Sequence, residues 1–287
     1  MLIRRNTEGS HLFSETIDNN LNIFDMQGLL LDRNGHFTTA IEAFELTANS
    51  RLKSLSQEAF DGEEKLYVRA SFAAQVGVPF YVLLHKEGEH IIHFFELYAD
   101  ADSHKCKCRN KFHLSEAQFI EWWHERKQTR QTKPYREQFL GRVRRSYFDS
   151  LLESNELKWG GNIDGYFVSS KETNYTVEGI IEKRFTTRRS ITRYDPAYYF
   201  NYGGGDYKTW EPLFTLKNQL AVPLYLFTYS RCEGEERKVG VTVVTSLSQR
   251  GITYITDERN HVILPYSNIC NNEAELKQRL QYLQTLL

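Results

Sequence analysis

Residues 75–82 read QVGVPFYV, and residues 219–226 read QLAVPLYL. Both stretches have the pattern of a helix end, a small capping residue and a buried strand that begins at a proline. In each copy a Glu-Gly-Glu turn follows, at 87–89 and at 233–235, and another apolar stretch comes after the turn. The shared order predicts two α/β units of similar plan.

The likeness extends upstream of these stretches. Residues 22–31 lead through Asn-Gly at 34–35 into 37–47, and residues 162–168 lead through a short turn into 175–184. Both patterns predict a strand, a turn and a second strand, and Asn-Gly is typical of a hairpin. Convergence on a common α/β join is the alternative, but four features in the same order favour duplication. Acidic amphipathic helices are expected to end the two copies, at 115–123 and 273–287.

The expected fold class is therefore α/β, with two tandem domains at 1–125 and 146–287. Each would be a mixed central sheet flanked by helices. A basic linker at 126–145 joins them, with eight Lys and Arg residues against a single acid, and Pro134 interrupts any helix there. Helical spacing of apolar residues from Gln138 onward predicts a helix that opens the second domain.

Composition excludes several classes of protein. The 287 residues are 40% hydrophobic and 25% charged, with a formal net charge of −1, which excludes a uniformly basic, histone-like binder. No apolar run approaches the roughly 18 residues of a membrane span. The polar start and four cysteines without framework spacing predict a cytoplasmic protein with reduced thiols and no membrane partner.

Acidic residues recur on the paired strands of each copy. Asp164 stands on the first strand of the second copy, and Glu178 and Glu182 stand on the next. Carboxylates on antiparallel neighbours can converge on a hard divalent cation such as Mg²⁺, with a nearby Lys or Arg to stabilise phosphate charge. On a regular strand Arg184 shares a face with both glutamates, and Lys183 points to the other face. The first copy has Asp25, Glu42 and Glu45.

At these residues the chain resembles the PD-(D/E)xK nuclease-like superfamily, whose restriction-endonuclease-like core has a strand with Asp, a strand with Glu-x-Lys, a crossover helix and further strands. The second copy matches with Asp164, Glu182 and Arg184. Arg cannot accept a proton, although it can position phosphate. Lys183 replaces it only if a bulge follows Glu182. The first copy matches with Asp25, Glu45 and Thr47, without a basic residue.

The resemblance implies a Mg²⁺-dependent phosphodiester hydrolase with a restriction- or defence-like role and no organic cofactor. Asp164 and Glu182 would hold the metal, with Glu178 as second choice, and Arg184 or Lys183 would stabilise the developing charge. The alternative is a catalytically inactive pseudonuclease that binds nucleic acid or assembles with a protein partner, including a second copy of itself. A third alternative is an interaction protein that binds no nucleic acid, in which these acids simply face solvent.

Basic and aromatic residues predict contact with DNA or RNA. Clustered Arg binds phosphate without sequence preference, and aromatic rings beside a flexible Gly run can stack on unpaired bases. The alternatives are a solvated linker and an apolar cluster under a long loop. The candidate residues are Arg142, Arg144, Arg145, Arg188, Arg189, Arg193, Tyr198 and Tyr199.

One further cluster has metal-ligating residue types: His104, Cys106, Cys108 and His113. Cys-x-Cys is an uncommon spacing for zinc, and the interleaved Lys and Arg residues are equally typical of an exposed edge strand.

Overall fold

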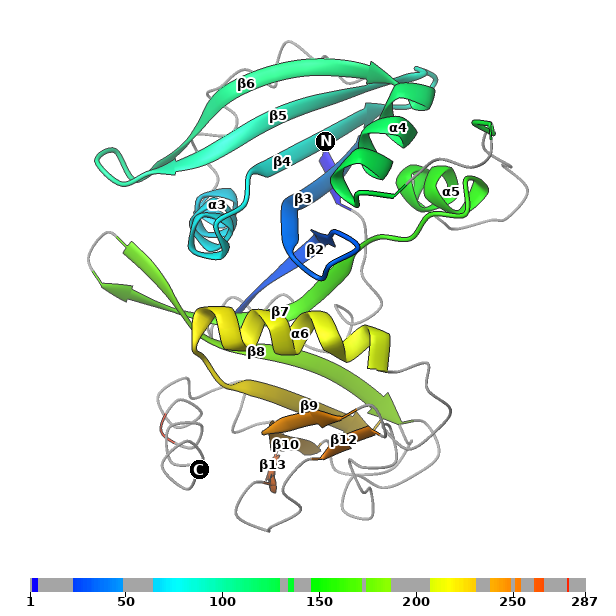
Figure 1. Ribbon diagram of the computed structural model, residues 1–287. Coiled ribbons are helices and arrows are strands. Elements are labelled where there is room, and N and C mark those ends of the chain that lie inside the picture. The colour runs from blue at the N-terminus through cyan, green and yellow to red at the C-terminus, as the bar shows by residue number, and fades with distance from the viewer. Residues whose placement is uncertain are drawn as a thin grey trace. The chain divides into compact units, whose positions relative to one another are not determined.

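A computed structural model describes residues 2–4, 23–48, 64–129, 134–136, 146–171, 174–186, 207–230, 238–248, 251–253, 261–265 and 278 (Figure 1). All but two of the described strands belong to one mixed, open sheet, and the other two pair only with each other. Helices lie between strands in the sequence, so the predicted α/β class is confirmed. The described helices are α3 (Glu64–Val76), α4 (Glu116–Arg126), α5 (Tyr147–Ser154) and α6 (Tyr207–Leu220). The strands are β1 (Leu2–Arg4), β2 (Ile23–Leu31), β3 (Phe37–Leu46), β4 (Phe80–Lys86), β5 (Ile91–Asp100), β6 (Lys105–Ser115), β7 (Gly161–Lys171), β8 (Asn174–Thr186), β9 (Leu224–Ser230), β10 (Lys238–Val244), β11 (Ser246–Ser248), β12 (Gly251–Thr253) and β13 (His261–Pro265).

The chain divides into two compact units. Unit 1 comprises Met1–Asn6, Met26–Asn162 and Ser170–Thr176, and unit 2 comprises Thr7–Asp25, Ile163–Ser169 and Val177–Leu287. The division falls inside β2, β7 and β8, so the units are not consecutive stretches of sequence like the predicted halves 1–125 and 146–287.

In unit 1, strands β2 to β6 are neighbours in sequence order, and β1 pairs with β3. The β2–β3 hairpin turns at Asn34-Gly35 as predicted: Gly35 has φ +82°, and Asp32 Oδ1 accepts the Asn34 and His36 N–H groups at 2.8 and 2.9 Å. β3 and β4 run parallel, and the other pairs along this order are antiparallel. α3 connects the parallel pair and contacts β3, β4, β5 and β6 (Figure 1).

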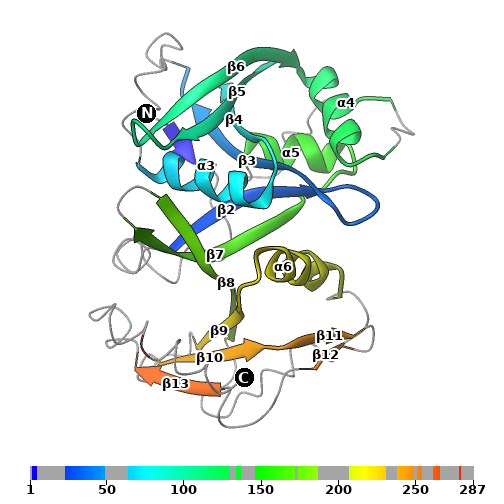
Figure 2. The same cartoon turned by 60° about the vertical axis from the view of Figure 1, so that its left-hand side comes forward.

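In unit 2, strands β7, β8, β9, β10 and β13 follow one another in that order. Two residues join β7 to β8, which requires an antiparallel hairpin. β8 and β9 run parallel, β9 and β10 run antiparallel, and α6 lies between β8 and β9 in the sequence and contacts β9 (Figure 2). The order strand, strand, helix, parallel strand, antiparallel strand therefore occurs in both units.

The repeated sequence that ends α3 and α6 has the same local geometry in both places. Gly77 and Ala221 both have positive φ, +79° and +53°, and both donate to a carbonyl three residues earlier. The following prolines, Pro79 and Pro223, each accept a 2.9 Å hydrogen bond from the neighbouring parallel strand. The predicted sequence of helix end, small capping residue and Pro-opened strand is thus confirmed at both sites.

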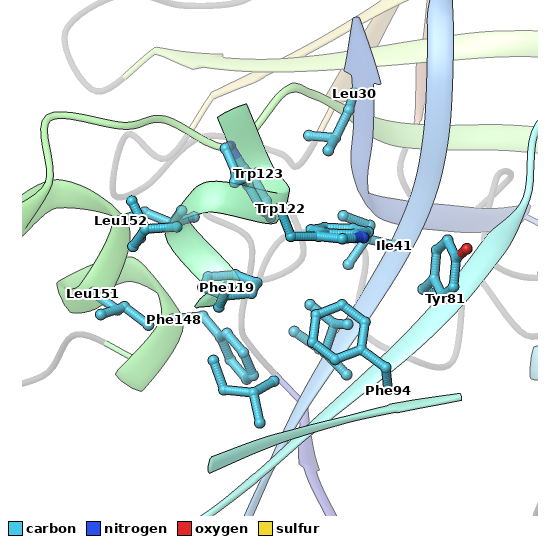
Figure 3. Close-up of a cluster of buried hydrophobic side chains, with 14 residues drawn as sticks. Leu30, Ile41, Tyr81, Phe94, Phe119, Trp122, Trp123, Phe148, Leu151 and Leu152 are labelled. Carbon is cyan, nitrogen blue, oxygen red and sulfur yellow. The ribbon is translucent and has the colours of Figure 1, made fainter. Parts of the chain in front are cut away.

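The core of unit 1 contains an aromatic cluster between the sheet, α4 and α5 (Figure 3). Phe119 on α4 packs against Phe148 on α5 with ring centroids 6.1 Å apart, and Trp123 belongs to the same cluster. α5 buries Phe148, Leu151 and Leu152, whose spacing places them on one face. The helix that the sequence places at the start of the second half therefore packs in unit 1.

A partly buried polar network lies beside this cluster. Tyr147, the first residue of α5, stacks on His85 of β4 with ring centroids 3.2 Å apart. Its hydroxyl donates to Glu116 Oε1 at 2.6 Å, and the Tyr135 hydroxyl donates to the other oxygen of the same carboxylate. The Tyr147 N–H donates to Glu45 Oε1 at 2.7 Å, so the network joins both helices to the sheet.

Burial of the His85 imidazole lowers its pKa. The carbonyl and carboxylate of Glu89 and the carboxylate of Glu116 act in the opposite direction, whereas His90 adds to the lowering. The balance keeps His85 neutral at physiological pH.

None of the helices among the described residues is long and apolar enough to cross a membrane.

Candidate functional site

In unit 2, Asp164 on β7 lies beside the consecutive residues Glu182, Lys183 and Arg184 on β8. The backbone N–H of Lys183 donates to Asp164 Oδ2 at 3.0 Å. Lys183 lies between Glu182 and Arg184, so this hydrogen bond holds the Asp164 carboxylate beside the triplet. Glu182 and Lys183 are both 5% exposed.

Gly165, the residue after Asp164, allows this close approach. A Cβ atom there would lie 3.1 Å from Ile23 Cγ2 and 3.3 Å from Ile181 Cβ, which is tighter than ordinary van der Waals contact. A residue with a Cβ at position 165 would require Ile23 or Ile181 to shift by a few tenths of an ångström.

Arg184 neutralises Glu182. Its Nη2 lies 2.8 Å from Glu182 Oε1, and its guanidinium carbon lies 5.8 Å from the ring centroid of Trp210 on α6. The side chain of Glu182 is 7% exposed, whereas that of Arg184 is 31% exposed. The ion pair therefore has one buried member and one that reaches solvent.

Desolvation raises the pKa of the Asp164 carboxyl. The Lys183 N–H and the positive charges of Lys183 and Arg184 lower it, and the carboxylate of Asp25 raises it further. Burial is the largest of these effects, so a cation beside the Asp164 carboxylate, or a proton bound to it, offsets the cost of burying its negative charge.

The register of β8 decides between its two basic residues. Pairing with β9 is continuous from Ile180 to Thr186, and Lys183 lies opposite Phe227 without a shift. No bulge thus occurs along this pairing, and side chains alternate between the faces. Arg184 shares a face with Glu182, as their ion pair requires. Lys183 would replace Arg184 only if a bulge followed Glu182, and no bulge is present along this pairing.

Glu178, the second-choice acid, is exposed and lies four residues before Glu182 on the same strand. At the rise of an extended strand this separates the two by about 13 Å. Glu178 therefore does not lie beside Glu182 and Asp164. The predicted nucleic-acid contacts lie outside the described residues: Arg142, Arg144, Arg145, Arg188, Arg189, Arg193, Tyr198 and Tyr199.

The described part of the chain contains no group of three or more His, Cys, Asp and Glu side chains that could hold a metal ion. This applies to the His104, Cys106, Cys108 and His113 cluster as well. A Mg²⁺ ion needs fewer protein ligands than three, because it binds through one or two carboxylates and keeps several waters or phosphate oxygens. Asp164 and Glu182 each have carboxylate oxygens, which are the type of ligand that Mg²⁺ prefers.

Unit 1 contains the same junction between its first two strands. The backbone N–H of Ala43 donates to Gln27 Oε1 at 2.6 Å, as Lys183 does to Asp164. The Gln27 N–H donates to Glu42 Oε1 at 3.1 Å. Arg69 of α3 completes the group, with its Nε 3.2 Å from the same oxygen of Glu42.

Two further features support the correspondence between the Gln27–Glu42 junction of unit 1 and the Asp164–Glu182 junction of unit 2. Gly28 follows Gln27, and a Cβ on Gly28 would lie 3.4 Å from Ile41 Cβ, much as Gly165 faces Ile181. Each isoleucine directly precedes the buried glutamate of its unit.

The counterpart of Asp164 in unit 1 is therefore Gln27, and the counterpart of Glu182 is Glu42. This correspondence differs from the predicted match of the first copy, which used Asp25, Glu45 and Thr47. The missed signal was in the sequence: Ile-Glu occurs at 41–42 and 181–182, and the polar residue before glycine occurs at 27–28 and 164–165.

No protein-family model, curated protein or solved structure matches this chain. Local geometry and residue chemistry are therefore the grounds for a function.

Proposed function

We propose that the chain is a nucleic-acid-binding protein of nuclease-like plan that arose by duplication, with a Mg²⁺-dependent phosphodiester hydrolysis site in unit 2. The observation that carries the proposal is the 3.0 Å hydrogen bond from the Lys183 N–H to Asp164, which sets a carboxylate beside Glu182 and Arg184. Unit 1 is its non-catalytic counterpart, because Gln27 replaces the aspartate and Arg69 holds Glu42.

The order of elements supports the proposal. A strand with Asp, an antiparallel strand with Glu-x-Arg, a helix and a parallel strand are β7, β8, α6 and β9. The PD-(D/E)xK core has this order, with Lys in the position of Arg184. Fold analogy alone does not fix function, so the residues carry the weight.

Each side chain has a role that its chemistry allows. Asp164 and Glu182 would hold Mg²⁺, which when bound activates a water and polarises the phosphate. Arg184 would bind a non-bridging phosphate oxygen, since a guanidinium is a strong donor and never a proton acceptor. Lys183 contributes its backbone N–H to Asp164 and a positive charge near it.

The proposal is tested with labelled single- and double-stranded DNA and RNA in Mg²⁺ or Mn²⁺. Wild-type protein should cleave at least one substrate, and Asp164→Asn should not, because the amide keeps the shape but loses the charge. Gln27→Asn, at the corresponding position of unit 1, is the matched control and should retain cleavage. Cleavage that survives Asp164→Asn, or no cleavage of any substrate by the wild type, refutes the catalytic assignment.

One observation favours a second candidate, a pseudonuclease that binds nucleic acid or a protein partner without cleaving. Glu182 is already paired with Arg184, as Glu42 is with Arg69. Salt-dependent binding of the same oligonucleotides without turnover would establish this candidate.

A further inference from the structure

The equivalent glutamates, Glu42 and Glu182, are each paired with an arginine, but the two arginines lie on different elements of their units. In unit 1 the guanidinium comes from α3, through Arg69, eight residues before the Gly77 cap. Eight residues before the Ala221 cap of unit 2 stands Leu213, which is 2% exposed and cannot do this. The charge comes instead from Arg184, two residues beyond Glu182 on the same strand.

These two ion pairs also differ in access to solvent. The side chains of Arg69 and Glu42 are 5% and 0% exposed, so neither can change partner without leaving the other charge buried. The Arg184 side chain is 31% exposed, and its Nε is buried without a hydrogen-bond partner among the described residues. The Arg184 guanidinium is therefore reached by solvent and has a further N–H donor for another acceptor.

A phosphate is the group that would compete for Arg184. Arg binds phosphate and carboxylate through the same planar pair of N–H donors, so one can replace the other. The exchange leaves Glu182 buried and negative, which is unfavourable unless a cation takes the place of the guanidinium. Phosphate on Arg184 and a divalent cation on Glu182 therefore favour each other.

We propose that Arg184 acts as a guard of Glu182, by which we mean that it occupies the Glu182 carboxylate until a phosphate displaces it. The ion pair closes the carboxylate to cations in the absence of nucleic acid, and a backbone phosphate draws the guanidinium away and admits Mg²⁺. Nucleic acid and divalent cation then bind cooperatively, and each raises the affinity for the other by the same factor. This inference rests on the proposed function of unit 2.

The test measures Mn²⁺ binding to the full chain by electron paramagnetic resonance, with and without a saturating nuclease-resistant phosphorothioate oligonucleotide. In wild-type protein the oligonucleotide should tighten Mn²⁺ binding by about tenfold, within the usual range of couplings between sites. Arg184→Gln should bind Mn²⁺ more tightly than wild type without oligonucleotide and should lose the coupling. Lys217→Gln also removes one positive charge, from a position on α6 about 10 Å along the helix from Trp210, and should behave as wild type.

The outcomes separate the two proposals. If Mn²⁺ binds the wild type and Asp164→Asn abolishes that binding, the proposed metal site stands. In that case unchanged Mn²⁺ affinity in Arg184→Gln, or coupling that persists in it, overturns the guard. If neither Mn²⁺ nor oligonucleotide binds the wild type, both proposals fail.

Discussion

Replacing Phe148 by alanine tests whether α5 stabilises unit 1. Phe148 is fully buried, and its ring centroid lies 6.1 Å from that of Phe119 and 6.3 Å from that of Trp159. Truncating a buried Phe removes its transfer free energy and leaves a cavity, at a cost of about 3–5 kcal/mol. With a urea m-value of about 2 kcal/mol/M, the unfolding midpoint of unit 1 should fall by about 2 M.

Tryptophan fluorescence is the natural assay, because three of the four tryptophans in the chain lie in or against this cluster: Trp122, Trp123 and Trp159. Glu121 lies on the exposed side of α4, the helix that packs against α5, and Glu121→Ala should change the unfolding free energy by less than about 0.5 kcal/mol. A loss below about 1 kcal/mol for Phe148→Ala would refute the view that α5 belongs to the unit 1 core.

Four further substitutions test features of the two units, each by urea unfolding. Ala221→Gly should stabilise the protein by up to about 1 kcal/mol, because Ala221 has a left-handed φ of +53°, whereas Gly77→Ala should destabilise it by a similar amount; equal effects of the same sign would contradict this. Arg69→Met should cost about 3–5 kcal/mol, because it leaves the buried Glu42 carboxylate without its guanidinium, and a loss below 1 kcal/mol would show that the ion pair is not structural. His85 has a lowered pKa, so the stability from its neutral form is complete above its unfolded pKa of about 6.5 and is lost as the pH falls below it; His85→Asn should therefore lose less stability between pH 7.5 and 5.5 than wild type does, and parallel curves would contradict this.

Much of the local structure follows from sequence alone, because its causes are local. Gly at the hairpin turn and proline at a strand start restrict only their own backbone and immediate neighbours. The repeat at 75–82 and 219–226 therefore predicts the helix ends and the strands that follow them. Asp164 and Glu182 could also be placed near each other, because a short hairpin brings the start of one strand to the end of the next.

The register of the first copy could not be predicted from alternation. Asp25 and Gln27 are two residues apart and lie on the same face of a strand, so a slip of two residues preserves the pattern of buried and exposed positions. The hydrogen bond from the Ala43 N–H to Gln27 and the fit of Gly28 against Trp159 and Ile41 distinguish the two registers, and both are properties of the packed structure.

The assignment of α5 failed for a different reason. An amphipathic helix shows in its sequence that one face is buried, but not which core buries it. Tyr147–Ser154 follows the basic linker, and proximity in sequence favoured the second half. The aromatic face of α4 decides otherwise, since Phe119 packs against Phe148.

The place of α5 also determines how this chain should be cut for study in pieces. A fragment that ends at residue 125 lacks Phe148 and Trp159, so it would present Phe119 and Trp123 of α4 to water. Such a surface promotes self-association, and a failed binding assay on that fragment would report aggregation rather than function. A fragment meant to preserve the unit 1 core must extend through Asn162.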